Sequence, residues 1–506
     1  MTQKNRLNNA GRINRKKPVN FKYDGKSYTG YEGDTLASAL LANDVHLVGR
    51  SFKYHRPRGI MTASVEEPNG LVQLEKGEYG EPNSRTTQTE LYDGLTAKSQ
   101  NCFPSVKYDI GGLNQLIAKF IPSGFYYKTF MPNMKAWMFF EKIIRRAAGL
   151  GKSTELPDPE QYARKTVYCD VLIAGGGPAG LVSALNAGKT GARVILMDEQ
   201  NEMGGWGLTS PNMEIDGKKA SVWIADMLSQ LNKLKNVEVV SRATVIGYFD
   251  YNFLTAVERI TDHISIDQRD KEIPRQRFWR IRAKQVILAQ GALERPMLFA
   301  NNDRPGVMMA SAIRTYMNRY GVMPGNNIVF TTNNDTAYFT AIEASKNGAN
   351  VTIVDIRKDL KSDLLKQAEN QGIKVYTNSA IVDVKGSHRV SGVEVMELAD
   401  DGKTCVGSVT KITADLVGMS SGWTPTVHLF SQARGKLKWD EKLTMFLPDT
   451  CQQDVQCVGA CNGTMDMTTT LNESASAGVN AGKLSGNKSV SATKHKAQSH
   501  KEAPMR

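Results

Sequence analysis

Long apolar runs are missing from this sequence. No stretch of the 506 residues approaches the ~20 consecutive apolar residues that a membrane-spanning helix needs, and the N-terminus is polar and basic, without the apolar core of a signal peptide. These absences predict a cytoplasmic protein with no membrane partner. The hydrophobic (41%) and charged (23%) fractions exclude disorder for most of the chain, whose length suits two to four domains.

Cysteine and histidine are both scarce. Six cysteines favour a reducing compartment over a disulfide scaffold. The spacing of Cys451, Cys457 and Cys461 matches no common zinc or iron–sulfur pattern, so we expect buried structural thiols and no metal site. None of the seven histidines belongs to a motif that indicates a catalytic triad. We therefore expect no catalytic residue in this chain.

The net charge of +13 is concentrated at the two ends of the chain. Residues 1–17 carry six basic and no acidic side chains, and residues 481–506 carry six basic side chains and one acidic one. Only about +2 remains for residues 18–480. We expect two disordered basic tails, and no nucleic-acid partner, because such a partner needs a basic face on the folded body.

The N-terminal part predicts a small α+β domain over residues 18–104. Alternating apolar residues from Val19 to Tyr23 lead into an Asp24-Gly25 turn and a second strand, and a capped helix over 36–42 follows. This order is typical of a ferredoxin-like unit.

Residues 105–164 predict a connecting segment rich in aromatic side chains. Seven aromatics fall within residues 125–140, among them Phe125, Tyr126, Tyr127 and Trp137. Two interpretations stay open. The segment is either a helical layer packed on a neighbouring element or a contact surface for another subunit.

The strongest motif follows a short apolar strand over residues 167–174. Gly175-Gly-Gly-Pro-Ala-Gly180 is a G-x-G-x-x-G fingerprint, and a helix, a second strand and the acids Asp198 and Glu199 come after it. Gly175 permits the tight turn, Gly177 lets the backbone approach a pyrophosphate, and Gly180 lets the helix pack on the strand. Asp198 is placed to bind a ribose 2′-OH. The pattern predicts a dinucleotide at the N-terminus of this helix.

A second strand–helix–strand unit is expected inside the first, at about residues 324–410. Its turn, residues 332–337, has lost the glycines of the fingerprint, so this unit is expected to be empty or to bind something unusual. Strands at 284–291 and 454–460 return to the first unit. The predicted fold is thus an α/β, Rossmann-type two-dinucleotide-binding plan over residues 165–480, the plan of many flavoproteins, preceded by the ferredoxin-like domain.

Several long stretches resemble the alpha subunits of heterotetrameric sarcosine oxidases. The resemblance extends from about residue 18 to 480, and its most specific stretches are residues 33–42, 49–59, 125–131, 295–306 and 422–425.

The resemblance implies a ligand assignment that the residues alone leave open between FAD and NAD. It implies NAD in this chain, FAD in a beta subunit, and FMN at the contact between alpha and beta. The residues expected to contact NAD are Gly175, Gly177, Ala179, Gly180, Asp198, Glu199, Gln200, Gly205, Trp206, Val245, Ala460 and Met465.

The resemblance also implies partners and a reaction. With small gamma and delta subunits and a flavin-bearing beta subunit, the complex would oxidise sarcosine to glycine, releasing hydrogen peroxide and formaldehyde or methylenetetrahydrofolate. The family's folate-binding, aminomethyltransferase-like domain is missing after residue 480, so tetrahydrofolate is expected as a partner only if a separate chain supplies that domain.

The sequence departs from ferredoxin-like domains in the loop that would carry cluster ligands. Residues 50–58 contain no cysteine, and Cys102 is the one cysteine of the domain, so no iron–sulfur cluster is expected. The basic and aromatic residues of this loop suggest an inter-subunit or anionic-cofactor contact. Two other functions remain in view: an FAD-carrying large subunit of an opine or amino-acid dehydrogenase, and a non-catalytic scaffold stabilised by a dinucleotide.

Overall fold

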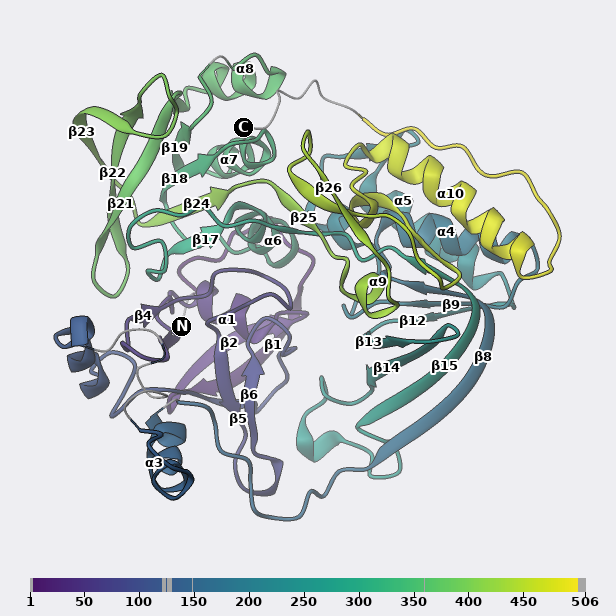
Figure 1. Cartoon of the computed structure of the whole chain (residues 1–506), viewed down its shortest axis with the longest axis horizontal. Coiled ribbons are helices and arrows are strands. Elements are labelled where there is room, and N and C mark those ends of the chain that lie inside the picture. Colours follow the sequence, from purple (N-terminus) through teal and green to yellow (C-terminus); the bar gives the residue numbers. More distant parts are fainter. Residues whose placement is uncertain (1–2, 121–123, 125–129, 148, 359, 499–506) are drawn as a thin grey trace.

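The computed structural model describes residues 3–120, 124, 130–147, 149–358 and 360–498. It consists of an N-terminal domain and two units of the Rossmann type, the second inserted in the first (Figure 1). The predicted fold class is therefore confirmed.

The N-terminal domain is a five-stranded sheet in the order β2-β1-β7-β5-β6, with helix α1 against it. Tyr23 pairs with Lys26 across the predicted turn. Thr35 caps α1 through a capping box, and all seven residues of the helix are buried. The elements are β1 (Asn14–Tyr23), β2 (Lys26–Glu32), α1 (Leu36–Ala42), β5 (Leu71–Leu74), β6 (Glu81–Arg85) and β7 (Thr96–Ser99).

The first dinucleotide-binding unit is a seven-stranded sheet in the order β12-β9-β8-β15-β14-β13, with β28 paired to β15. Strands β12, β9, β8, β15 and β28 run parallel, so their carboxyl ends meet at one edge. Helices α4, α5 and α10 lie together on one face (Figure 1). The elements are β8 (Tyr162–Ala174), α4 (Pro178–Lys189), β9 (Val194–Met197), α5 (Ala220–Asn232), β12 (Val237–Val240), β13 (Ala243–Phe249), β14 (Phe253–Arg259), β15 (Gln276–Leu288), β28 (Val455–Cys457) and α10 (Met467–Leu484).

The second unit is a five-stranded parallel sheet in the order β17-β24-β18-β19-β20. Strands β17 and β24 lie outside the predicted interval of about 324–410, because the chain contributes a strand to this sheet both on entering and on leaving the insertion. A three-stranded sheet, β21-β22-β23, packs beside it. The elements are β17 (Val307–Met309), α6 (Ala310–Tyr320), β18 (Asn327–Thr332), α7 (Thr336–Lys346), β19 (Asn350–Asp355), α8 (Asp363–Asn370), β20 (Lys374–Tyr376), β21 (Ser379–Gly386), β22 (Val390–Leu398), β23 (Cys405–Thr413) and β24 (Leu416–Ser420).

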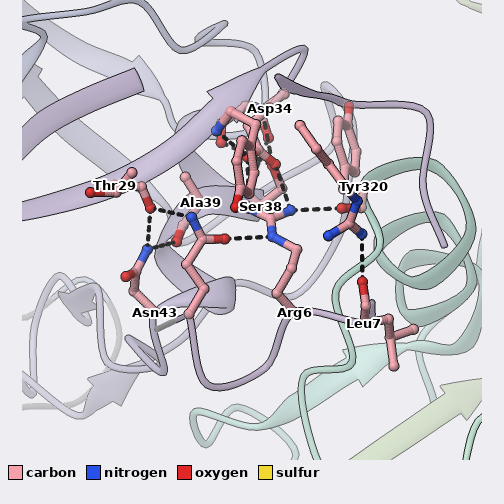
Figure 2. A network of polar contacts seen from close by, with 12 residues as sticks. Arg6, Leu7, Thr29, Asp34, Ser38, Ala39, Asn43 and Tyr320 are labelled. Carbon is pink, nitrogen blue, oxygen red and sulfur yellow. Dashed lines mark hydrogen bonds and ion pairs between the residues drawn. The ribbon is translucent and has the colours of Figure 1, made fainter. Parts of the chain in front are cut away.

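The N-terminal segment is packed, so the prediction of a disordered tail over residues 1–17 is wrong where the structure describes it. Figure 2 shows Arg6 between the N-terminal domain and helix α6. Its guanidinium donates to Tyr320 O (2.6 Å) and, through two nitrogens, to the buried carboxylate of Asp34 (2.7 and 3.1 Å). The basic composition predicts disorder, but the guanidinium of Arg6 has specific acceptors that hold the segment in place.

The C-terminal segment needs the same correction over residues 481–498. Helix α10 continues to Leu484, and the chain then folds back along the first unit. His495 Nδ1 lies 2.7 Å from Asp216 Oδ2, and Ala497 is buried. Residues 499–506 lie outside the described residues.

Membrane insertion has no candidate in the described ranges. None of their helices combines the length and the apolar composition that crossing a bilayer requires.

Candidate functional site

The glycine loop between β8 and α4 excludes side chains at two of its three fingerprint positions. Gly175 has φ +106°, and a β-carbon there would clash with the carbonyl oxygen of Ala289. A β-carbon on Gly180 would clash with the carbonyl oxygen of Gly175. The structure therefore gives each glycine the steric reason that the fingerprint predicts.

The third glycine faces open space. Gly177 precedes α4 as its N-cap, Pro178 occupies the first helical position, and the nearest atom to a β-carbon on Gly177 would be Gly205 Cα at 4.0 Å. A helix leaves its first N–H groups without intrahelical partners, and its dipole is positive at this end. The loop is thus a cradle into which a phosphate group can approach the backbone.

Gly204 and Gly205 pack against the backbone of the glycine loop. Gly204 N–H donates to Gly176 O (2.8 Å), and a β-carbon on Gly205 would lie 2.9 Å from Gly177 Cα. Both glycines have positive φ, at +129° and +48°. The predicted contact residue Gly205 therefore lies directly against the fingerprint.

Asp198 is anchored by the backbone of the loop. Its carboxylate accepts hydrogen bonds from Gly176 N–H (2.6 Å) and Gln200 N–H (2.8 Å). A carboxylate offers about four lone-pair sites, so two remain for a ribose hydroxyl. Burial raises the pKa of Asp198.

Glu199 carries a proton more readily than an ordinary glutamate. Burial, and then the neighbouring Asp198, raise its pKa to about 7. Ser64 of the N-terminal domain lies 3.3 Å away and donates its hydroxyl to Glu199 Oε1. Sequence reasoning missed Ser64, because no local pattern links residues 135 positions apart.

Three more predicted residues belong to other elements of the first unit. In η6 (Gly459–Asn462), a β-carbon on Gly459 would lie 3.2 Å from Ala179 Cβ, which puts the adjacent Ala460 at the start of α4. Met465 follows η6 and is exposed. In β13, the N–H of Ala243 donates to Asp198 O (2.8 Å), which places that strand, with Val245, beside the end of β9.

Trp206 and Gln200 lie on the side of the site that faces α6. Trp206, in η4 (Gly205–Thr209), has the guanidinium carbon of Arg314 5.0 Å from its ring centroid and remains 42% exposed. Gln200 Oε1 accepts a hydrogen bond from Arg319 (3.0 Å). Sequence reasoning missed both arginines, which belong to the second unit.

One buried acceptor beside the loop has no partner within the described ranges. Gln290 follows β15, and its side-chain oxygen is inaccessible to solvent. Its backbone nitrogen would lie 3.1 Å from a β-carbon on Gly175. Buried polar atoms of this kind are normally satisfied by a ligand or a water molecule. The open cradle and the anchored acid together fit a dinucleotide.

The corresponding turn of the second unit is filled by its own side chains. Arg357 lies between two buried carboxylates, 2.8 Å from Asp335 Oδ1 and 2.7 Å from Asp355 Oδ2. The hydroxyl of Tyr338 donates to Asp355 (2.9 Å). Asp355 ends β19 as Asp198 follows β9, but its oxygens are engaged, so these residues do not fit a second dinucleotide.

The donor set of the N-terminal domain does not fit an iron–sulfur cluster. Such a cluster needs four thiolate ligands, or histidines in place of two of them, and residues 16–102 contain one cysteine, Cys102. Elsewhere in the described part of the chain, no three His, Cys, Asp or Glu side chains are grouped as metal ligands would be. Cys461 is buried, whereas Cys451 and Cys457 are partly buried.

Two family models match the chain. The model of pyridine nucleotide-disulphide oxidoreductases matches residues 169–481, which is more than half of the chain. A model described as a 2Fe-2S iron-sulfur cluster binding domain matches residues 16–102, where the fold is kept without the cysteines.

Curated relatives extend the match to more than nine tenths of the chain. The alpha subunit of sarcosine oxidase from Rhizobium meliloti is 43% identical over 472 residues, which are 93% of this chain and 46% of that protein. The alpha subunit of sarcosine oxidase from Corynebacterium sp. is 36% identical over 94% of this chain and 45% of its own length. The chain therefore spans about half the length of these relatives. An opine oxidase subunit from Rhizobium meliloti is 25% identical over 56% of this chain and 55% of that protein.

A solved structure shares the fold. L-proline dehydrogenase from P. horikoshii superposes with a TM-score of 0.61 at 19% identity, covering 96% of this chain and 77% of that one. At this identity the likeness supports the architecture alone.

Proposed function

Because the chain belongs to the pyridine nucleotide-disulphide oxidoreductase family, we propose that it is the dinucleotide-binding subunit of a sarcosine oxidase-type complex. The similarity to sarcosine oxidase alpha subunits over 93% of the chain supports this assignment. In the complex, a flavin-bearing beta subunit oxidises sarcosine to glycine, small gamma and delta subunits complete the assembly, and FMN lies at the alpha–beta contact.

The single observation that carries the proposal is the open cradle at Gly177 beside the anchored Asp198. We propose that the start of α4 holds the pyrophosphate of NAD and that Asp198 holds a ribose hydroxyl. Ala179, Ala460 and Gly205 border the cradle. When bound, a nicotinamide dinucleotide supplies a hydride acceptor. The chain's own residues bind and orient it.

Glu199 holds a proton at this site near neutral pH. Because its pKa is raised to about 7, a fraction of the molecules present a neutral carboxyl group, which can donate as well as accept a hydrogen bond. A neutral carboxyl also avoids placing a second negative charge beside Asp198. We propose that Glu199 and Gln200 complete the ribose contacts.

The contact with the beta subunit is proposed at the connecting segment. Of the predicted aromatics, Phe125, Tyr126 and Tyr127 lie outside the described residues. The described part still presents large apolar side chains to solvent, including Leu116 (81% exposed) and Phe120 (84% exposed). Exposed apolar patches mark interaction surfaces, and burying them yields about 25 cal/mol per Å² before association costs. The exposed apolar side chains of this segment include Leu113, Leu116, Phe120, Met134, Met138, Phe139 and Ile143.

Co-expression with a candidate beta subunit tests the proposed function. The chain alone should not turn over sarcosine, whereas the assembled complex should release glycine and peroxide. Turnover by the isolated chain, or no turnover by an assembled complex, would contradict the proposal.

The second candidate is an opine oxidase-type subunit that itself carries FAD. It is favoured by the 25% identity to the opine oxidase subunit from Rhizobium meliloti, although this match covers only 56% of the chain. The absorbance of the purified chain separates the two functions, since a bound flavin is yellow and NAD is colourless.

A further inference from the structure

A cavity of about 310 Å³ lies between the N-terminal domain and the second unit. Its walls come from the hairpin of β3 (Gly49–Arg50) and β4 (Pro57–Arg58), from the turn before β17, and from the turn between β21 and β22, which approaches β4 in Figure 1. We call it the arginine pocket. It is lined by Arg50, Arg56, Pro57, Gln115, Asp303, Arg304, Gly386, Ser387 and His388, none of which belongs to the glycine-loop site.

The lining of the arginine pocket is strongly positive. It contains three guanidinium groups and one carboxylate, Asp303. That carboxylate is already engaged, because Arg56 donates to both of its oxygens (2.8 Å each) and Arg58 contacts it as well. Arg50 and Arg304 therefore have no acid of their own within the lining.

Arg50 is fixed in place mainly by uncharged acceptors. It donates to the backbone carbonyls of Val106 (2.6 Å) and Lys107 (3.1 Å), and Asp109 lies 4.0 Å away on one side. Its Nη2 is 3.5 Å from His388 Nε2. Burial, Arg50 and Lys107 lower the pKa of His388, so this ring is a neutral hydrogen-bonding group in the wall.

Arg304 is the least compensated of the three guanidinium groups. Its Nη1 donates to Ser387 O (3.3 Å), while its buried Nε has no acceptor anywhere in the described ranges. Burial, and then the charge of Arg56, lower the pKa of Arg304. A partly buried guanidinium group with an unsatisfied nitrogen is stabilised when an anion lies beside it.

We propose that the arginine pocket binds the phosphate group of a small phosphomonoester. Guanidinium groups recognise phosphate with paired, charge-assisted hydrogen bonds, and a doubly charged anion suits a wall with three guanidinium groups and one carboxylate, in which Arg304 keeps an unsatisfied nitrogen. A volume of about 310 Å³ also leaves room for the organic part of the molecule. Since the walls come from both the N-terminal domain and the second unit, occupancy would clamp the two together.

Calorimetric titration of the purified chain tests this site. The probes are inorganic phosphate and glycerol 3-phosphate at low ionic strength, with glycerol as the neutral control. We expect one saturable site per chain for the phosphate compounds and none for glycerol. Tighter binding of glycerol 3-phosphate identifies a phosphomonoester, whereas equal binding identifies free phosphate. Absence of saturable binding by both phosphate probes would overturn the proposal.

Variants assign the binding to the pocket. Arg304→Gln should weaken phosphate binding at least tenfold, and Arg304→Lys should restore part of it because the charge returns. Arg434→Gln, in an exposed ion pair elsewhere, is the matched control. Thermal unfolding of each variant shows whether the fold is retained. If Gly180→Ala abolishes phosphate binding while Arg304→Gln does not, the anion binds at the glycine loop and the proposal is wrong.

Discussion

The two units of the Rossmann type share a topology but differ at the turn where a dinucleotide would bind. In the first unit, β8, α4 and β9 surround a loop whose glycines leave backbone open at Gly177. In the second, β18, α7 and β19 surround a turn closed by Arg357 between Asp335 and Asp355. The same strand–helix–strand fold therefore supports two roles, and the residues of the turn decide which one applies.

The difference is also one of stability. The glycine loop gains little from its own contacts, because glycine has no side chain to pack and loses more backbone entropy on folding than other residues. In the closed turn, the buried ion pairs of Arg357 with Asp335 and Asp355 occupy the place that a ligand would take. We infer that the first turn is maintained for ligand binding and the second for the packing of the inserted unit.

Exchanging one residue between the two turns should have the largest effect. Gly180 and Ala337 occupy the same position in the two sequences of six residues, 175–180 and 332–337. Gly180→Ala should abolish dinucleotide retention, because its β-carbon meets the carbonyl of Gly175. Ala337→Gly, the matched control, should leave retention unchanged and cost about 1–2 kcal/mol of stability, because the helix loses propensity and a buried methyl group. The amount of nucleotide released on denaturing each purified variant is the measurement. Full retention by Gly180→Ala would show that the dinucleotide does not depend on the glycine loop.

Opening the closed turn should affect stability rather than binding. Arg357→Gln leaves the buried carboxylates of Asp335 and Asp355 without their cation, which should cost about 3–5 kcal/mol in urea unfolding. Nucleotide content should not change. Arg434→Gln removes an exposed pair with Asp250 and should cost less than about 1 kcal/mol. An Arg357→Gln variant as stable as this control would show that the network does not hold the turn.

The equivalent acids should respond differently to neutralisation. Asp198→Asn should weaken dinucleotide binding about tenfold to a hundredfold, because hydrogen bonds to a charged acceptor contribute about 1.5–3 kcal/mol. Asp355→Asn should leave binding unchanged. Fluorescence titration with the dinucleotide measures both. If Glu199→Gln causes the loss and Asp198→Asn does not, the ribose contact belongs to Glu199.

The smallest expected effect is on the pH dependence of the free energy of unfolding, through Glu199 beside the first turn. Since the pKa of Glu199 is raised to about 7, the folded chain binds this proton more tightly than the unfolded chain. Its contribution is therefore present at low pH and is lost as the pH rises toward 7, by on the order of 1 kcal/mol because the side chain is only partly buried. Glu199→Gln should flatten the profile between pH 4.5 and 7, and Glu272→Gln, an exposed control, should not.

The parts of the structure that could be predicted from sequence are those encoded locally. The glycine loop, the capped helix α1 and the Asp24-Gly25 turn each depend on residues close together in the chain, and all three are confirmed. The loss of glycines from residues 332–337 was also visible in the sequence.

What could not be predicted depends on long-range contacts. The interactions of Ser64 with Glu199 and of Arg319 with Gln200 join segments more than 100 residues apart. The basic ends were predicted to be disordered because composition alone does not reveal acceptors such as Asp34 for Arg6 or Asp216 for His495. The number of charges in a segment does not determine whether the segment is ordered. Ion pairs and hydrogen bonds between specific residues do.

Identification of the nucleotide released by denaturing the purified chain tests whether the first unit alone holds NAD. We expect one NAD per chain and no flavin, since one turn is open and the other is closed. Stoichiometric FAD would contradict the ligand assignment and favour the opine oxidase-type function. Two nucleotides per chain would contradict the difference between the two units.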